Sequence, residues 1–234
     1  DTLARELSML APNDLRVAWA DRGTATFAYG DGAGRIRVTL SRDHRGPGAA
    51  LRLLPAEPPL LSGLGLGGAI EWLGARGLIA IAGPSGSGKT TTLGALVRAL
   101  GEQHRRVVAI EDPIEIVHVS GWISQRAVRD HVPSVGEGVA AAMREGVDAI
   151  VVGVVHTAAD AAAVMEAVAG GHLVLTTLDA PRGGLAIDRL VDRLPLEQRD
   201  LARALCAECV LGTIGPLISR AGRSFEIAGR GIPA

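Results

Sequence analysis

Lysine is almost absent from this chain of 234 residues: Lys89 is the only one, and every other side-chain cation apart from histidine is an arginine. Aromatic residues make up 3% of the chain, and they are too scattered to form a stacking platform for nucleic-acid bases. The formal net charge of −1 gives no broad basic field either. Because non-specific nucleic-acid binding depends on such a field, the composition predicts no nucleic-acid partner.

Cysteine is also scarce, with a single C-x-x-C pair, Cys206 and Cys209. Two cysteines alone cannot complete a tetrahedral zinc site. The surrounding LARALCAECVLGTI predicts an amphipathic helix, in which cysteine is an ordinary core residue. We therefore interpret the pair as structural, with a redox or metal role as the alternative.

Long apolar runs and targeting signals are missing as well. No apolar run reaches the length of about 18 residues that suggests a membrane span, and the first residues, DTLARELSML, show no signal-peptide pattern. These absences predict a cytoplasmic protein. The chain begins without Met, so a lost leader stays open.

The first part of the chain predicts a small domain of mixed structure. Residues 1–13 have a helical pattern, and three short apolar or alternating segments between glycine-rich breaks predict strands in hairpins, at 24–29, 34–40 and 49–54. Residues 55–68 are rich in proline and glycine and are the best linker candidate. We expect a first domain over residues 1–60, a linker over 61–68 and a main domain over 69–234.

From residue 69 strands and helices alternate regularly. Near-continuous apolar runs predict strands at 77–82, 106–110, 148–152 and 172–177. Helices are predicted at 88–101, 134–145, 157–169 and 195–211. Strands of this composition are typical of a parallel sheet covered by helices on both faces, which predicts an α/β fold.

A complete phosphate-binding motif lies between the first of these strands and the helix that follows it. Residues 83–90 read GPSGSGKT, which matches G-x-x-x-x-G-K-[ST]. The glycines allow backbone N–H groups to surround phosphate oxygens, and the helix N-terminus adds its dipole. The motif predicts ATP and Mg²⁺ as ligands, with the ammonium of Lys89 on the β- and γ-phosphates and the hydroxyl of Thr90 on the metal. The predicted nucleotide-binding residues are Gly83, Pro84, Ser85, Gly86, Ser87, Gly88, Lys89, Thr90 and Thr91.

Four further segments, in this order, give the chain a family resemblance: EDPIEIVH at 111–118, QR at 125–126, MREGVDAIVVG at 143–153 and GHLVLTTL at 171–178. Together with the phosphate loop they resemble the secretion-superfamily ATPases, the hexameric motors of type II secretion and type IV pili. Within that superfamily the chain is most similar to the pilus-retraction (twitching motility, PilT-like) ATPases. The resemblance implies a RecA-like P-loop core with a mostly parallel sheet, preceded by a PAS-like α/β N-terminal domain that is truncated here.

The resemblance also implies catalytic roles. EDPIE occupies the place of the family's Asp box, whose second glutamate is regarded as the catalytic carboxylate, and Glu115 stands there. A carboxylate that faces the γ-phosphate can orient and deprotonate the attacking water. Glu111 is a second catalytic candidate, Asp112 a metal ligand beside Thr90, and His172 the remaining histidine of the family's His box.

Two arginines of the first domain have the spacing of the family's arginines that reach a neighbouring subunit's phosphates. Arg37 and Arg52 are fifteen residues apart, with RGPG between them. A guanidinium suits phosphate and the charge of the transition state. Because such a contact works only between subunits, the resemblance implies a homo-hexamer. It further implies an inner-membrane platform protein of a pilus or secretion system as partner, with a paralogous ATPase as another, and a location peripheral to the inner membrane through those partners.

Two positions depart from the family pattern. The family's Walker B segment ends in Gly-Glu, whereas Gly153 is followed here by Val154, and the second histidine of the His box is replaced by Asp179. Losing a metal-orienting or acid–base group typically lowers a rate by about 10²–10⁴. Two functions therefore stay open: an ATP-hydrolysing motor subunit, and a hydrolysis-impaired nucleotide-binding subunit that regulates or scaffolds an active partner. A small-molecule kinase and a helicase explain fewer of the motifs.

Overall fold

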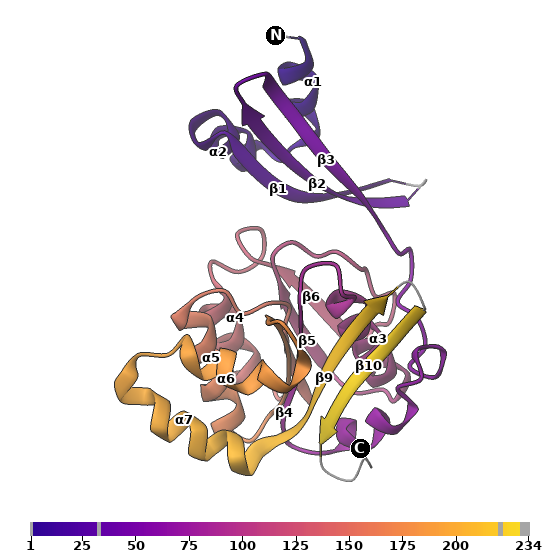
Figure 1. Cartoon of the computed structure of the whole chain (residues 1–234), viewed down its shortest axis with the longest axis vertical. Coiled ribbons are helices and arrows are strands. Elements are labelled where there is room, and N and C mark those ends of the chain that lie inside the picture. Colours follow the sequence, from indigo (N-terminus) through magenta and orange to yellow (C-terminus); the bar gives the residue numbers. More distant parts are fainter. Residues whose placement is uncertain (1, 32–33, 220–221, 230–234) are drawn as a thin grey trace. The chain divides into compact units, whose positions relative to one another are not determined.

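The computed structural model describes residues 2–31, 34–219 and 222–229 and divides into two compact units. The first unit combines Asp1–Glu57 with a distant segment, Asp112–Val117, which we call the Asp-box segment. The second unit comprises Pro58–Glu111 and His118–Ala234. Both are drawn in Figure 1. The small first domain predicted from the sequence thus receives six residues from the middle of the chain.

The first unit consists of two helices and a three-stranded antiparallel sheet. Its helices are α1 (Thr2–Leu10) and α2 (Asn13–Arg22), and its strands are β1 (Thr24–Asp31), β2 (Gly34–Asp43) and β3 (Gly46–Leu54), in the order β1-β2-β3. Helix α2 was not predicted, because NDLRVAWADR has almost no helical amphipathicity. It ends at Gly23, which caps it in the left-handed conformation with a φ of 70°.

The faces of this small sheet differ in character. Phe27, Val38 and Leu40 are buried together with Trp19 of α2 and form the unit's core. Because successive side chains of a strand point to opposite faces, Arg35 and Arg37 project from the other face of β2. Strand β3 places Arg52 directly opposite Arg37 in the register. The spacing of fifteen residues therefore corresponds to a cross-strand pair.

The second unit is built on a seven-stranded sheet in the order β10-β9-β4-β8-β7-β5-β6. Its strands are β4 (Gly77–Gly83), β5 (Val107–Glu111), β6 (Ile123–Ala127), β7 (Ala149–Val152), β8 (Leu173–Asp179), β9 (Val210–Ser219) and β10 (Gly222–Gly229). All neighbouring pairs are parallel except β10 and β9, which form an antiparallel hairpin. The predicted α/β fold with a mostly parallel sheet is confirmed.

Helices cover both faces of this sheet, as Figure 1 shows. On one face lie α4 (Val135–Arg144), α5 (Ala158–Ala169), α6 (Ala186–Asp192) and α7 (Leu196–Cys209). On the other lie α3 (Lys89–Glu102) and the 3₁₀ segments η1 (Ser62–Leu64) and η2 (Gly67–Gly74); a third, η3 (Gly183–Leu185), precedes α6. Along β4 the residues alternate between the two cores, with Leu78 in one and Ile79 in the other. Burial on both sides explains the continuous apolar runs in the sequence.

The segment that was expected to be a linker is packed. Leu61, Leu64 and Leu66 are buried and belong to the core shared with α3. These three leucines of PLLSGLGLGG anchor the chain, and Gly65 between two of them adopts a left-handed φ of 73°. The two units divide between Glu57 and Pro58. Among the described residues, no helix has the length and apolar character needed to cross a membrane.

Candidate nucleotide-binding site

The GPSGSGKT loop connects the central strand β4 to helix α3, at the carboxyl end of the parallel strands. Ligand sites of open α/β sheets lie at this edge. Gly86 and Gly88 adopt left-handed conformations with φ of 79° and 100°, which residues with a side chain rarely adopt. A Cβ atom added at Gly86 would meet no heavy atom within 4 Å, so the space beside it is open.

Helix α3 begins at Lys89 without a side-chain cap at Gly88. The first backbone N–H groups of any helix have no intrahelical acceptor, and here no side chain at Gly88 caps them, so they can bind an anion. Ser87 is buried, and its Oγ atom has no hydrogen-bond partner among the described residues. The loop thus combines open space, free donors and a helix N-terminus, which suits a phosphate group.

Lys89 lies across the loop and is 11% exposed at its side chain. Its Nζ atom donates to the carbonyl oxygens of Gly83 and Pro84, both at 2.9 Å. It also forms an ion pair with Oδ1 of Asp179 at 2.9 Å. The ammonium of Lys89 thus lies against the backbone of the phosphate loop, and Asp179 is its charged partner.

Strands β8, β7 and β5, which follow β4 in the order of the sheet, end at the same edge as the loop. Strand β8 ends at Asp179, which is in register with Gly83 of β4. Strand β7 is followed by Gly153, whose carbonyl oxygen accepts a hydrogen bond of 2.6 Å from Oγ1 of Thr177. Val154 comes next and is half-buried, so this edge has an apolar side chain where the family pattern has a glutamate.

Glu111 ends strand β5 and is oriented by Gln125. The Nε2 atom of Gln125 donates to Oε1 of Glu111 at 2.8 Å, and its Oε1 atom accepts from the backbone N–H of His118 at 2.9 Å. A Cβ atom at Gly153 would lie 3.1 Å from Cγ of Glu111, so glycine leaves room for this carboxylate. Sequence reasoning found Glu111 and the QR dipeptide but missed the contact between them.

His118 is held in its neutral form. Burial, together with the charge of Arg98, lowers the pKa of His118 from 6.5 to about 4. The imidazole of His118 therefore carries no positive charge at physiological pH, and the residue donates its backbone N–H to Gln125.

The Asp-box segment packs within the first unit, where two arginines of β2 bind it. Arg37 forms an ion pair with Oε1 of Glu115, which is buried. Arg35 donates from Nη2 to the carbonyl oxygen of Ile114 at 2.7 Å and from Nε to that of Glu115 at 3.1 Å. The structure thus brings together Arg37 and Glu115, and it adds Arg35, which the sequence did not single out. Arg52 is exposed beside Arg37.

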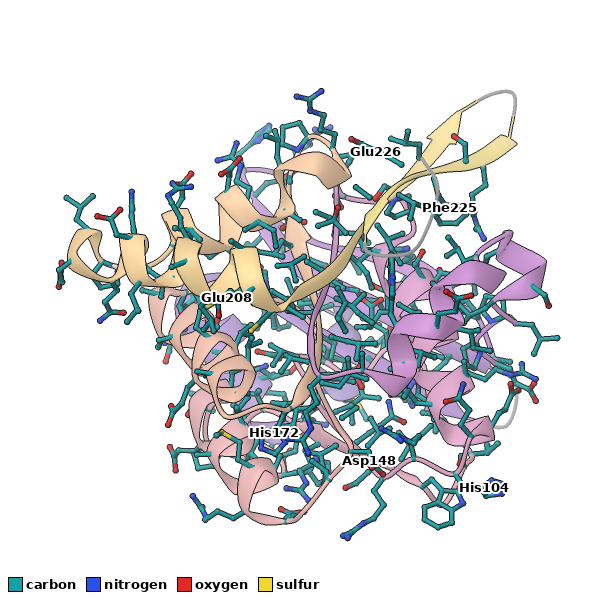
Figure 2. All side chains as sticks on the ribbon, turned by 90° about the horizontal axis from the view of Figure 1, so that it is seen from below. His104, Asp148, His172, Glu208, Phe225 and Glu226 are labelled. Carbon is teal, nitrogen blue, oxygen red and sulfur yellow. The ribbon has the colours of Figure 1, made fainter. Side chains whose placement is uncertain are left out.

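His172 does not lie at the phosphate loop of its own chain, and its catalytic role inferred from the resemblance stays a prediction. It precedes β8, and its carbonyl oxygen accepts from the backbone N–H of Gly77 at the beginning of β4. Strand β8 has seven residues, so at about 3.3 Å per residue its two ends are roughly 20 Å apart. Figure 2 shows His172 near Asp148, which precedes β7, and far from Glu226. Glu226 marks the other end of β8, because its carboxylate accepts from the backbone N–H of Gly183, beyond that end. His172 therefore cannot touch a phosphate held by Lys89 of its own chain.

The cysteine pair lies on α7, as predicted. Cys206 is buried and Cys209 is half-buried, and both are free thiols. Burial and the neighbouring Cys209 raise the pKa of the Cys206 thiol to about 11. A thiol this weakly acidic is a poor nucleophile at neutral pH, which agrees with the structural interpretation. Among the residues that the structure describes, no three His, Cys, Asp or Glu side chains gather as a metal site.

The described residues fit the nucleotide better than they fit a metal held by protein alone. Lys89, the uncapped start of α3 and the open space at Gly86 suit phosphate. Thr90 is half-buried in the first turn of α3, next to Lys89, and its hydroxyl is of a kind that could share Mg²⁺ with the phosphates. Loop and sheet together define a RecA-like P-loop nucleotide-binding protein.

The comparisons with known proteins assign the family. The model of the type II/IV secretion system protein family matches residues 72–211. The chain therefore belongs to this family. It is 34% identical over 197 residues to the type IV pilus retraction ATPase PilT of Pseudomonas aeruginosa, which covers 82% of this chain and 57% of the relative. It is 33% identical over 185 residues to a twitching motility protein of Neisseria gonorrhoeae, covering 77% of this chain and 50% of that protein.

Solved structures support the same assignment. The crystal structure of the pilus retraction motor PilT with bound ADP aligns with a TM-score of 0.81 at 30% identity, covering 96% of this chain and 68% of that chain. The ATPase DotB of Legionella pneumophila aligns with a TM-score of 0.79 at 26% identity, covering 94% and 66%. The small antiparallel sheet of the first unit fits the N-terminal domain expected from the resemblance. The chain spans between half and three fifths of the length of these curated relatives.

Proposed function

We propose that this chain is the nucleotide-binding part of a ring-forming ATPase motor subunit of the pilus-retraction or type II/IV secretion kind. The observation that carries the proposal is the position of Lys89, whose ammonium lies in a loop with left-handed glycines at the uncapped start of α3. The family assignment and the ADP-bound structural relative support ATP as the ligand.

Each proposed role follows from the chemistry of a described group. Lys89 and the N–H groups of α3 bind the β- and γ-phosphates, and Thr90 supplies a hydroxyl to Mg²⁺. When bound, Mg²⁺ neutralises phosphate charge during transfer to water. Glu115 is proposed to accept a proton from the attacking water, with Glu111 as the second carboxylate and Asp112 as a further metal ligand.

The arginine pair of the first unit is proposed to act between subunits. Arg37 and Arg52 lie directly opposite each other on β2 and β3, which concentrates two positive charges that normally repel each other. A polyphosphate from a neighbouring subunit would relieve this repulsion, and guanidinium groups bind phosphate with two parallel hydrogen bonds. We therefore propose a homo-hexamer whose nucleotide lies between subunits.

A second candidate function is favoured by two specific observations. Val154 stands at the edge of the sheet where an acid would orient the metal, and Arg37 pairs with the carboxylate of Glu115. Both features would slow hydrolysis without weakening the phosphate loop. The alternative is therefore a hydrolysis-impaired subunit that binds nucleotide and regulates or scaffolds an active paralogous ATPase.

We also propose the cellular setting that the relatives' names suggest. The chain would work on the cytoplasmic side of the inner membrane, attached through a platform protein of a pilus or secretion system. Relatives named as pilus retraction, twitching motility and type II secretion proteins support this setting.

Nucleotide-dependent thermal stabilisation tests the binding role. Lys89→Ala removes the charge that the β- and γ-phosphates would meet, so ATP should no longer raise the melting temperature. In the unmodified chain, ATP at about 100 times its Kd should stabilise the fold by about 2.7 kcal/mol. Arg45→Ala, which changes an exposed arginine of the first unit, is the control and should keep the full shift. Equal shifts with and without Lys89 would refute the binding site.

Turnover and sedimentation then separate the two functions. A motor subunit should hydrolyse ATP as an oligomer, and Arg52→Ala should reduce turnover or nucleotide-linked assembly while leaving the melting temperature unchanged. Tight ATP binding without turnover would select the regulatory subunit. A monomer at all concentrations, with and without nucleotide, would contradict the ring.

A further inference from the structure

Asp179 places a negative charge in the phosphate loop. Its Oδ1 atom lies 2.9 Å from Nζ of Lys89, and it is the only carboxylate within ion-pair distance of that ammonium among the residues the structure describes. The other acceptors of Lys89 are the backbone carbonyls of Gly83 and Pro84. The carboxylate therefore holds the one formal charge that the loop offers to a phosphate.

The backbone fixes this position. Asp179 is the last residue of β8 and is in register with Gly83, the first residue of the loop. The next residue, Ala180, donates its N–H to the carbonyl oxygen of Gly83 at 3.3 Å. Because β8 and β4 are adjacent strands, the backbone of Asp179 stays beside the loop even when the ion pair with Lys89 opens.

The two partners differ in exposure. The side chain of Asp179 is 57% exposed, whereas that of Lys89 is 11% exposed. An exposed carboxylate can swing into water at little cost, so an incoming phosphate can displace it from the ammonium. After displacement the carboxylate remains attached to the edge of the loop, and two negative groups then lie close together, which is unfavourable.

We propose that Asp179 is an affinity- and specificity-determining residue: its carboxylate competes with the nucleotide's phosphates for Lys89 and makes the loop prefer the metal-bound nucleotide. The inference rests on the proposed function, since it concerns the same loop. Mg²⁺ cancels part of the phosphate charge that the carboxylate repels. The penalty from Asp179 is therefore larger for free ATP than for Mg–ATP.

Calorimetric titration of the whole chain tests this inference, with ATP in EDTA and with ATP in excess MgCl₂, at low and at moderate salt. Asp179→Asn keeps the shape of the side chain and removes the charge. We expect it to tighten binding of metal-free ATP about tenfold and binding of Mg–ATP about threefold or less. Both gains should shrink as salt screens the repulsion.

Asp188→Asn is a matched control. Asp188 pairs with Arg203 on the surface at 3.2 Å and is 56% exposed, nearly the same as Asp179. This variant should bind ATP like the unmodified chain in all conditions. Melting temperatures without nucleotide show whether each variant is folded.

The outcomes distinguish the inference from the proposed function. If Lys89→Ala abolishes binding but Asp179→Asn binds ATP with unchanged or lower affinity, the competition is refuted and the nucleotide site stands. If Asp179→Asn tightens both forms of ATP equally, the preference for metal-bound nucleotide is refuted. If no folded variant binds ATP at all, the proposed function and the inference both fail.

Discussion

Arg35 provides the structure's least expected contact, and its removal gives a quantitative prediction. The guanidinium donates two hydrogen bonds to backbone carbonyls of the Asp-box segment, at Ile114 and at Glu115. A hydrogen bond from a charged donor contributes about 1.5–3 kcal/mol. Since the site is partly exposed, we take the lower half of that range for each of the two bonds and expect Arg35→Ala to lower the free energy of opening of this segment by about 3–4.5 kcal/mol.

Hydrogen exchange measures this opening directly. Each 1.4 kcal/mol is a factor of about ten in an equilibrium constant, so amides in residues 112–117 should exchange roughly 10²- to 10³-fold faster in Arg35→Ala. Arg35→Lys keeps the charge but loses the fork of donors, so its exchange rate should lie between those of Arg35→Ala and the unmodified chain. Arg45→Ala changes an exposed residue in the turn between β2 and β3 and should leave exchange unchanged.

Nucleotide affinity provides the second measurement. Lys89 and Arg35 belong to different units, so ATP binding should be the same in Arg35→Ala and in the unmodified chain. Turnover should fall, because Glu115 would no longer be held by its backbone. The reasoning is refuted if exchange in residues 112–117 stays unchanged, or if ATP affinity falls as much as turnover does.

Three further changes test other parts of the second unit. Val154→Glu places a carboxylate after Gly153 at the edge of the sheet, and steady-state turnover should rise about tenfold or more. A tenfold rise requires the activation barrier to fall by only about 1.4 kcal/mol. Slower turnover in this variant would show that another group serves the metal. The pKa of His118 is about 4 in the folded chain against 6.5 ordinarily, so the unfolded chain binds more protons between these values and stability should fall as pH drops from about 6.5 towards 4. His118→Gln should flatten that part of a urea-denaturation series against pH, and an unaltered slope would contradict the assignment. Iodoacetamide at neutral pH should label Cys209 before Cys206, because Cys206 is buried and its thiol pKa is about 11. Peptide mass spectrometry of the unmodified chain and of Cys209→Ser measures the labelling of each thiol. Preferential labelling of Cys206 would contradict its burial.

The central strands could be predicted from sequence to within two residues, whereas the sheet's outer strands could not. Strands β4, β5, β7 and β8 are apolar throughout because helices cover both faces. Strand β6 has the sequence ISQRA and lies at the edge of the sheet, where polar residues are tolerated and the apolar signal disappears. The pattern alone gives no reason to expect it.

Strands β9 and β10 were missed for a tertiary reason. A Cβ atom at Gly212 or Gly229 would collide with the ring of Trp72, so glycine is required where the two strands pass that side chain. In the sequence these glycines resemble breaks between elements. The helix predicted to continue to residue 211 ends at Cys209, because β9 begins at Val210 beside β4.

The site was predictable where one segment carries the chemistry and less so where distant segments meet. The phosphate loop is local, and its eight residues identify it. The contact of Arg35 and Arg37 with residues 114 and 115 joins positions about eighty apart, and a lone sequence contains no signal for it. The position of His172 could have been found, because it precedes a parallel strand whose other end carries Asp179.

The two departures from the family pattern lie on adjacent strands and change the charge of this edge in opposite ways. Strand β7 ends before Val154, where an acid is missing, and β8 ends at Asp179, where an acid is added. If both act on the bound polyphosphate, Val154→Glu alone leaves two carboxylates at the edge, and repulsion should limit its gain in turnover. Combining it with Asp179→His removes one of them, so turnover should exceed the product of the two separate effects. A strictly multiplicative result would show that the two positions act independently, because uncoupled sites contribute additive free energies.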